Sequence, residues 1–266
     1  MKENLTKSAI FILSNIWRTV NIQYIVGVIM YSFNSRVRYS EINQNKQLDL
    51  YAIINYFQDC STFQSEDIGM GIDYLDKMNR VWLMNAWQIN VNRFPSLGEN
   101  ITISTWAYDF KGMYGYRNFL ITDSNNEVCS NANSIWVYMD TRQNRPVRVI
   151  EEDIRGYGSE EPYPMNYAPR KIEIPQPLTC KDEFPVRRNH LDTNNHVNNG
   201  QYIKMAEEYL PEGFPIKQMR AEYKKSAMLG DLILPMIFEN ENLCTVVLAD
   251  TDQKPYAIIE FDKRTY

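Results

Sequence analysis

The predicted secondary structure repeats along this chain of 266 residues, and the repeat is the feature that most limits its fold. Each half begins with a short strand, continues with a helix and ends with four strands. The predicted helices span residues 48–63 and 199–209, and the strands before them span residues 32–39 and 184–188. This order indicates a duplicated α+β domain.

The helix of the first half is recognised by four apolar residues at helical spacing, Leu50, Ile53, Ile54 and Phe57. Turn residues separate the strands that follow each helix. In the first half these strands span residues 80–93, 100–110, 114–123 and 128–140, and in the second half residues 217–229, 232–240, 243–250 and 257–263.

The two halves also match residue by residue just before their helices. Val37-Arg38 and Val186-Arg187 lie 149 positions apart. The same offset pairs Ile42, Asn43, Asn45, Gln47 and Leu48 with Leu191, Asp192, Asn194, His196 and Val197, while Leu97-Gly98-Glu99 resembles Leu229-Gly230-Asp231. One copy therefore has ionisable side chains where the other has amides, as expected when only one copy of a duplicated domain keeps its chemistry.

We divide the chain into an N-terminal extension (1–29), a first domain (30–146), a linker (147–177) and a second domain (178–266). The linker is rich in proline, glutamate and tyrosine, which favours little regular structure. Polar residues interrupt the apolar extension, which falls short of the ~20 consecutive apolar residues of a membrane span. It also makes a poorly formed signal peptide, so we expect no stable membrane insertion, with Met30 as an alternative start.

Composition excludes some classes of function. The net charge is −5 and the charged residues, 23% of the chain, are of mixed sign, which argues against nucleic-acid binding. The 4 cysteines are scattered and form no C-x-x-C pair. They are typical of reduced thiols in a cytoplasmic protein rather than of a disulfide framework.

Three polar residues, Asp192, Asn194 and His196, alternate just before the second helix. A histidine titrates near neutral pH and can carry the proton in acyl transfer, while a carboxylate and an amide can orient the reacting groups. The N–H groups at the start of the following helix could stabilise an oxyanion. The purely structural alternative is that these residues cap the helix.

The motif D-x-N-x-H-V-N-N at residues 192–199, within a duplicated domain of this kind, resembles the fatty acyl–acyl carrier protein thioesterases. Further resemblance lies in residues 50–59, 87–89, 95–99 and 134–140. The resemblance implies two tandem hot-dog domains, each a long helix wrapped by a curved antiparallel sheet. It also implies hydrolysis of the thioester between a fatty acyl chain and the phosphopantetheine arm of acyl carrier protein (ACP), in fatty acid biosynthesis.

The resemblance places Asp192, Asn194 and His196 on catalytic positions. It also places Ser226 where the family usually has a glutamate, and Ala227 where plant members have a cysteine. Glu222 lies four residues before Ser226, about 13 Å along a strand, and cannot substitute directly. We expect His196 to be the general base for water and Asn194 to hold the water or the carbonyl. Asp192 either orients these groups or attacks the thioester itself.

The acyl chain needs an apolar slot, which Ile53, Ile54, Phe57 and Trp87 could line, although core packing is the preferred interpretation for them. Because acyl carrier proteins are acidic, we expect basic residues near the site to bind the carrier. The candidates are Arg187, Arg188, Lys224 and Lys225. On a strand, neighbouring side chains point to opposite faces, so at most one of each pair should face the carrier.

Several alternatives stay open beside the ACP thioesterase. An acyl-CoA thioesterase ranks next, then a hot-dog dehydratase, and Ser226 motivates a non-catalytic acyl-carrier-binding protein. A metal site built from His190, Asp192 and His196 is disfavoured because no further ligand cluster accompanies it. We therefore predict no metal or other cofactor, and leave a homodimer open.

Overall fold

The computed structural model describes residues 22–25, 28–192 and 194–264. The first half contains β1 (Ile22–Ile25), β2 (Val28–Arg36), α2 (Leu50–Asp67), α3 (Ile72–Met78), β3 (Arg80–Val91), β4 (Asn100–Lys111), β5 (Tyr114–Asp123), β6 (Val128–Asp140) and β7 (Arg145–Pro146). The second half contains α4 (Glu151–Ile154), β8 (Thr179–Cys180), β9 (Phe184–Pro185), α5 (Asn199–Glu207), β10 (Gln218–Tyr223), β11 (Leu232–Glu239), β12 (Leu243–Ala249) and β13 (Pro255–Asp262). Two 3₁₀ turns, η1 (Tyr39–Glu41) and η2 (Arg188–His190), precede α2 and α5.

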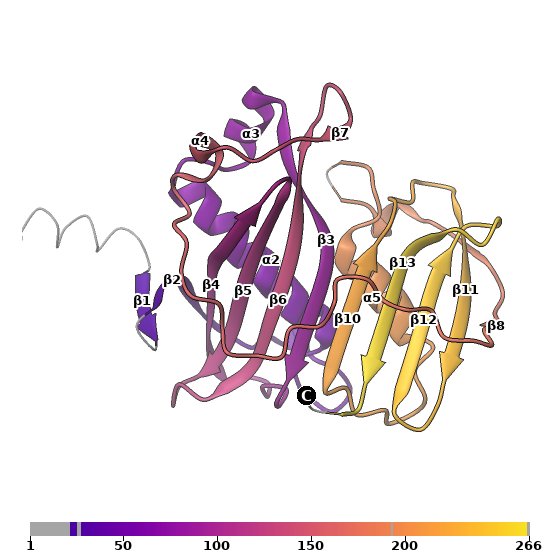
Figure 1. The fold of residues 1–266 in the computed structure, drawn as a ribbon. Coiled ribbons are helices and arrows are strands. Elements are labelled where there is room, and N and C mark those ends of the chain that lie inside the picture. The colour runs from indigo at the N-terminus through magenta and orange to yellow at the C-terminus, as the bar shows by residue number, and fades with distance from the viewer. Residues whose placement is uncertain (1–21, 26–27, 193, 265–266) are drawn as a thin grey trace, which may run out of the picture.

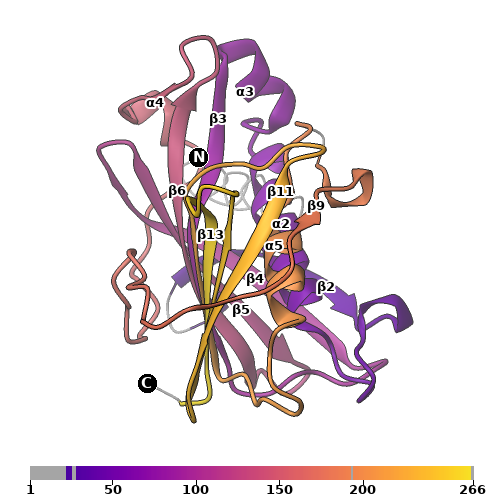
Figure 2. The ribbon, with the colours of Figure 1, turned by 90° about the vertical axis from the view of Figure 1, so that its right-hand side faces the viewer.

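The described strands form a 13-stranded sheet in the order β1-β2-β4-β5-β6-β3-β10-β13-β12-β11-β8, with β7 paired to β6 and β9 to β11. The halves join where β3 pairs antiparallel with β10, so that Trp87 lies opposite Ala221. Figure 1 shows the two sets of strands side by side, and Figure 2 shows α2 and α5 on the same face of the sheet. The architecture is the expected pair of tandem hot-dog domains.

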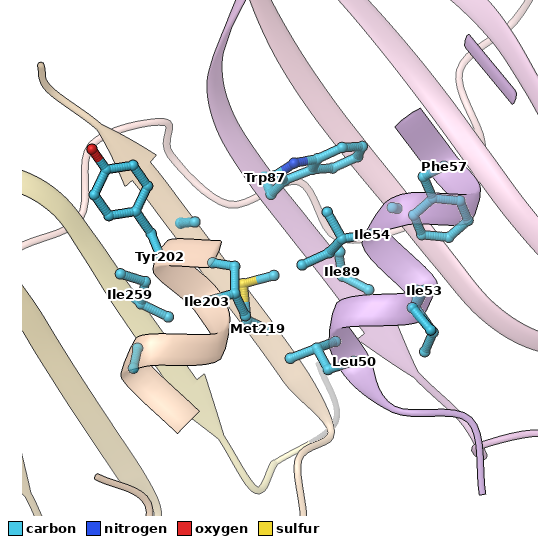
Figure 3. Packing of buried hydrophobic residues seen from close by; sticks show 14 of the residues in the cluster. Leu50, Ile53, Ile54, Phe57, Trp87, Ile89, Tyr202, Ile203, Met219 and Ile259 are labelled. Carbon is cyan, nitrogen blue, oxygen red and sulfur yellow. The ribbon is translucent and has the colours of Figure 1, made fainter. Parts of the chain in front are cut away.

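The two helices share one apolar core with both sets of strands. Figure 3 shows Leu50 of α2 facing Ile203 of α5 and Met219 of β10. Phe57 is fully buried, and its ring centroid lies 5.0 Å from that of Phe119 and 6.0 Å from that of Trp87. Burial of these apolar faces is the main term that stabilises the pairing of the two halves.

The core includes the four residues that could line the predicted acyl slot. Ile53, Ile54, Phe57 and Trp87 are at most 2% exposed and belong to the shared core. None of them lines the apolar pocket described below. These residues therefore pack in the core, as the preferred interpretation predicts, and they do not line that pocket.

The linker is held across the face of the sheet opposite the helices. Its backbone bonds to two buried side chains, since Gln88 Nε2 donates to the Asn166 carbonyl and the Ile172 N–H donates to Glu222 Oε2. Between residues 151 and 180 the described helices and strands are α4 and the two-residue strand β8. Regular structure is therefore scarce there, as the composition predicts. Glu222 thus has a structural function in fastening the linker.

Three predicted strands have wrong bounds: the one predicted over residues 217–229 is β10, which ends at Tyr223, and the one predicted over residues 32–39 is β2, which spans Val28–Arg36. Residues 184–188 do not form one strand, because β9 ends at Pro185 and the His190 N–H bonds back to the Arg187 carbonyl to start η2. The limit at Met30 cuts through β2, which begins at Val28 and pairs with β1. The rest of the extension, residues 1–21 and 26–27, lies outside the described residues. Across the described residues, no helix is long and apolar enough to span a membrane.

The short helix α3 had no sequence signal as strong as that of α2. Its start depends on a side chain from the preceding helix, because Glu66 Oε1 accepts the Ile72 N–H at 2.9 Å. A carboxylate at a helix start satisfies an otherwise unpaired donor and interacts favourably with the helix dipole. The contact lies six residues apart in sequence, outside the usual capping pattern.

Candidate functional site

The segment from Leu191 to Val197 forms a tight hairpin at the start of α5. Leu191 and Val197 form a β-bridge, and the Asp192 N–H donates to the His196 carbonyl at 2.8 Å. Asn195 has a φ of 60°, a left-handed conformation that asparagine tolerates better than most residues. The hairpin therefore holds Asp192 and His196 directly opposite each other.

The carboxylate of Asp192 takes part in folding this hairpin. Its Oδ1 accepts the Asn194 N–H at 2.8 Å and the His196 N–H at 3.2 Å. These bonds use a single carboxylate oxygen, and Oδ2 receives neither of them. Asp192 is thus a structural residue of the turn through Oδ1, and these two bonds do not involve its second oxygen.

The first half contains the same hairpin without the ionisable groups. Asn43 Oδ1 accepts the Asn45 N–H at 2.9 Å and the Gln47 N–H at 3.3 Å. Lys46 has a φ of 59°, matching Asn195, and Ile42 bridges Leu48. An amide is therefore sufficient to fold this turn, so the turn alone does not explain why the second copy has a carboxylate.

A second segment lies against the hairpin. His196 forms a β-bridge with Met228, and the Val197 N–H donates to the Ala227 carbonyl at 3.0 Å. Tyr202 of α5 fixes this segment, because its hydroxyl accepts the Ala227 N–H at 2.8 Å. The exposed Ser226 is next in sequence, so the structure brings the backbone of all four predicted catalytic residues into one region.

The start of α5 offers fewer free donors than the sequence suggested. Asn198 is the N-cap, and its Oδ1 accepts the Gly200 N–H at 2.8 Å. The Gln201 N–H donates to the Asn198 carbonyl. Two backbone donors that could have served an oxyanion are therefore already used, and the residue that caps the helix is Asn198 rather than Asp192, Asn194 or His196.

His190, the other histidine, belongs to the turn before the hairpin. Its Nδ1 accepts the Arg187 N–H at 3.1 Å. Burial, followed by the positive charge of Arg187, lowers the pKa of His190. Within the described part of the chain, His190, Asp192 and His196 do not form a cluster of ligand atoms that could hold a metal ion.

The four basic residues near the hairpin differ in their surroundings. Lys224 Nζ lies 2.5 Å from the buried carboxylate of Glu222, and Lys225 is paired with Asp250. Arg187 and Arg188 are exposed, and neither forms an ion pair with a described residue. Neither pair lies within a strand, since β10 ends at Tyr223 and Arg188 begins η2. The expectation that the two side chains of each pair point to opposite faces of a strand therefore does not apply.

An apolar pocket of about 180 Å³ lies in the first half, between α2, α3 and strands β3 to β6. Figures 1 and 2 place α3 and the hairpin before α5 at the same end of the molecule. The pocket is lined by Ser61, Thr62, Ser65, Gly71, Ile72, Leu75, Val81, Trp82, Ala107, Phe110, Gly115, Tyr116, Arg117, Trp136 and Tyr157. The wall of this pocket is mostly apolar.

Sequence reasoning missed this pocket and its one buried cation, Arg117. A signal was present, because Arg117, Phe119 and Ile121 alternate along β5 and therefore point to the same face. Phe119 and Ile121 belong to the core, which places an arginine on the inner face of the sheet.

Comparison with known sequences gives two adjacent family matches. The acyl-ACP thioesterase N-terminal domain matches residues 29–157, and the acyl-ACP thioesterase C-terminal domain matches residues 177–258. The chloroplastic palmitoyl–acyl carrier protein thioesterase of Arabidopsis thaliana is 28% identical over 218 residues, which are 74% of this chain and 52% of that protein. The chain thus spans about half the length of the curated relatives that it matches.

Solved structures share the fold. The acyl-ACP thioesterase of Bacteroides thetaiotaomicron superposes with a TM-score of 0.76 at 20% identity, covering 88% of this chain and 97% of that one. The 12:0-ACP thioesterase of Umbellularia californica gives a TM-score of 0.76 at 18% identity, covering 89% and 98%. Both likenesses support the tandem hot-dog architecture.

Proposed function

Because this chain belongs to the acyl-ACP thioesterase family, we propose that it hydrolyses the thioester of fatty acyl-ACP and releases the free fatty acid. The observation that carries this proposal is the pair of matching hairpins. The second hairpin keeps the backbone geometry of the first but has Asp192 and His196 where the first has Asn43 and Gln47. Since the turn does not require these ionisable groups, a chemical function is the simplest reason for their presence.

In the proposed reaction, His196 removes a proton from water as the water oxygen bonds to the thioester carbon. The resulting oxyanion is stabilised by N–H donors, among which the Asn194 side chain is a candidate. The carbon–sulfur bond then breaks, and the pantetheine thiolate takes up a proton. In the alternative route, Asp192 attacks through its carboxylate and the carbon–sulfur bond breaks to release the pantetheine thiolate, after which water hydrolyses the resulting anhydride.

Turnover of acyl-ACP across a series of chain lengths tests the proposal. Release of free fatty acid and free carrier thiol would support it. Binding of acyl-ACP without release would instead favour a non-catalytic carrier-binding protein, a candidate motivated by Ser226 at the position of the family glutamate. Faster turnover of acyl-CoA than of acyl-ACP would favour an acyl-CoA thioesterase.

Ser226 gives a separate prediction. If a carboxylate at this position mainly orients the attacking water, Ser226→Glu should raise kcat by up to about 10²-fold, whereas Ser226→Ala should change it little. Steady-state turnover of acyl-ACP would measure both effects. A fall in kcat on introducing glutamate would mean that the site is organised around the hydroxyl.

Carrier docking is proposed to depend on Arg187 and Arg188, which are exposed, more than on Lys224 and Lys225, which are engaged with Glu222 and Asp250. Reversal of charge at Arg187 and Arg188 should raise KM for acyl-ACP by about tenfold or more at low salt.

A small acyl thioester without a carrier is the control substrate for these variants, and its turnover should be unchanged. Lys181→Glu is a matched control for surface charge, because Lys181 is exposed beside β8. Equal losses on both substrates would assign the two arginines to folding or to the pocket rather than to docking.

We place the enzyme in the cytoplasm, supported by four free cysteines, of which Cys60, Cys129 and Cys244 are buried. The hydrolysis needs only water and protein side chains, so no cofactor is invoked. A homodimer is testable by sedimentation of the purified protein.

A further inference from the structure

Arg117 is a buried cation at the wall of the apolar pocket. It lies on β5 and is 7% exposed. Its Nη1 donates to Gln64 Oε1 of α2 at 2.5 Å and to Thr105 Oγ1 of β4 at 3.1 Å. The guanidinium carbon lies 5.3 Å from the centre of the Tyr157 ring. These contacts hold the guanidinium in one position between the helix and the sheet.

The contacts leave the charge of Arg117 without a counter-ion. Its hydrogen-bonding partners are neutral, and among the described residues it forms no ion pair. Burial lowers the pKa of Arg117 because the charged form loses hydration. A buried charge without a partner is strongly unfavourable, so proteins seldom keep one that has no ligand to bind.

The N–H donors of Nε and Nη2 lie on the edge of the guanidinium that is not bonded to Gln64, and the contacts above do not use them. An arginine has five N–H groups in a planar fork, and the two bonds above use only Nη1. The described residues provide no hydrogen-bond partner for Nε or Nη2. Since Arg117 lines the pocket, an acceptor for these donors can come from a molecule inside it.

The remaining wall of the pocket suits an alkyl chain. Trp82, Phe110, Leu75 and Trp136 provide apolar surface, and Ser61 and Ser65 of α2 add hydroxyl groups. An unsubstituted alkyl chain would fill the apolar part but would leave Nε and Nη2 without acceptors. A carboxylate fits them best, because the fork of arginine binds both of its oxygens.

We propose that this pocket selects acyl chains that carry an oxygen acceptor, above all a carboxylate, at the end remote from the thioester, and that Arg117 binds that group. The inference rests on the proposed thioesterase function, since it assigns the pocket to the acyl chain of the substrate. Arg117 is then a specificity residue, remote from the Asp192–His196 hairpin in sequence and in chemical function.

Binding of free acids tests the pocket independently of hydrolysis. Calorimetric titration would compare monocarboxylic fatty acids with α,ω-dicarboxylic acids of the same chain lengths. The wild-type protein should bind the best dicarboxylic acid about 10- to 100-fold more tightly than its monocarboxylic partner. Equal affinities at every chain length would overturn the proposal, and this comparison needs no variant.

Two variants then assign the preference to Arg117. Arg117→Met should abolish it, and Arg117→Lys should retain only part of it, because lysine keeps the charge but loses the fork. Arg220→Met is the matched control, since Arg220 is also largely buried but pairs with Glu260 outside the pocket. A preference that survives in a folded Arg117→Met protein would overturn the assignment.

Hydrolysis of matched acyl-ACP and ω-carboxyacyl-ACP separates the two proposals. Faster hydrolysis of the ω-carboxy substrate by the wild-type protein would support both. Turnover of plain acyl-ACP with no preference in either assay would overturn the specificity of Arg117 and leave the thioesterase function standing. Tighter dicarboxylate binding with no turnover of any thioester would support the pocket and overturn the proposed hydrolysis.

Discussion

Asp192→Asn should reduce kcat/KM for acyl-ACP by about 10²- to 10⁴-fold while leaving the protein folded. The amide of asparagine can make the same two bonds to backbone N–H groups that Asp192 Oδ1 makes, as Asn43 does in the first half. It cannot act as a nucleophile or stabilise a positive charge on His196. This substitution therefore removes the chemistry and keeps the turn, which Asp192→Ala would not do.

Steady-state kinetics and thermal unfolding, measured together, check this expectation. His196→Gln is the companion variant, because Gln47 occupies the equivalent place in the first hairpin, and it should lose turnover to a similar extent. Asn43→Ala should leave turnover nearly unchanged if the first copy is chemically silent. Wild-type turnover in either Asp192→Asn or His196→Gln would contradict the assignment of the site.

Phe57→Ala should lower the free energy of unfolding by about 3–5 kcal/mol. The ring is fully buried between Trp87 and Phe119, and its removal would leave a cavity in the core that the two halves share. Phe57 does not line the pocket, so the preference for chain length should stay unchanged in the protein that remains folded.

Urea unfolding measures this loss, and Phe63→Ala provides the comparison. Phe63 lies on the same helix, but it is 44% exposed, so its truncation should cost much less. A small loss of stability for Phe57→Ala, together with a shift in chain-length preference, would restore Phe57 to the acyl slot.

Local sequence was sufficient where an element depends on its own residues. The bounds predicted for β5 and β6 agree with the structure, because turn residues limit each strand at both ends. The predicted first helix, residues 48–63, overlaps α2, whose start is set by the Asp49 side chain accepting the Ala52 N–H. The repeated polar residues that identify the two copies are also the ones that fold the hairpins, although no hairpin is predicted there from the sequence.

The sequence by itself thus determined the duplication, the long helices and strands and the Asp192–His196 motif, because these are read from repeated residues and from patterns among near neighbours. Only the tertiary structure decided that β3 pairs with β10, that Lys225 is engaged with Asp250, and that Arg117 and Tyr157 line one pocket. These contacts join residues far apart in the chain, and each depends on how the helices and strands pack. No local periodicity carries that information, because the same pattern of polar and apolar residues is compatible with many long-range pairings.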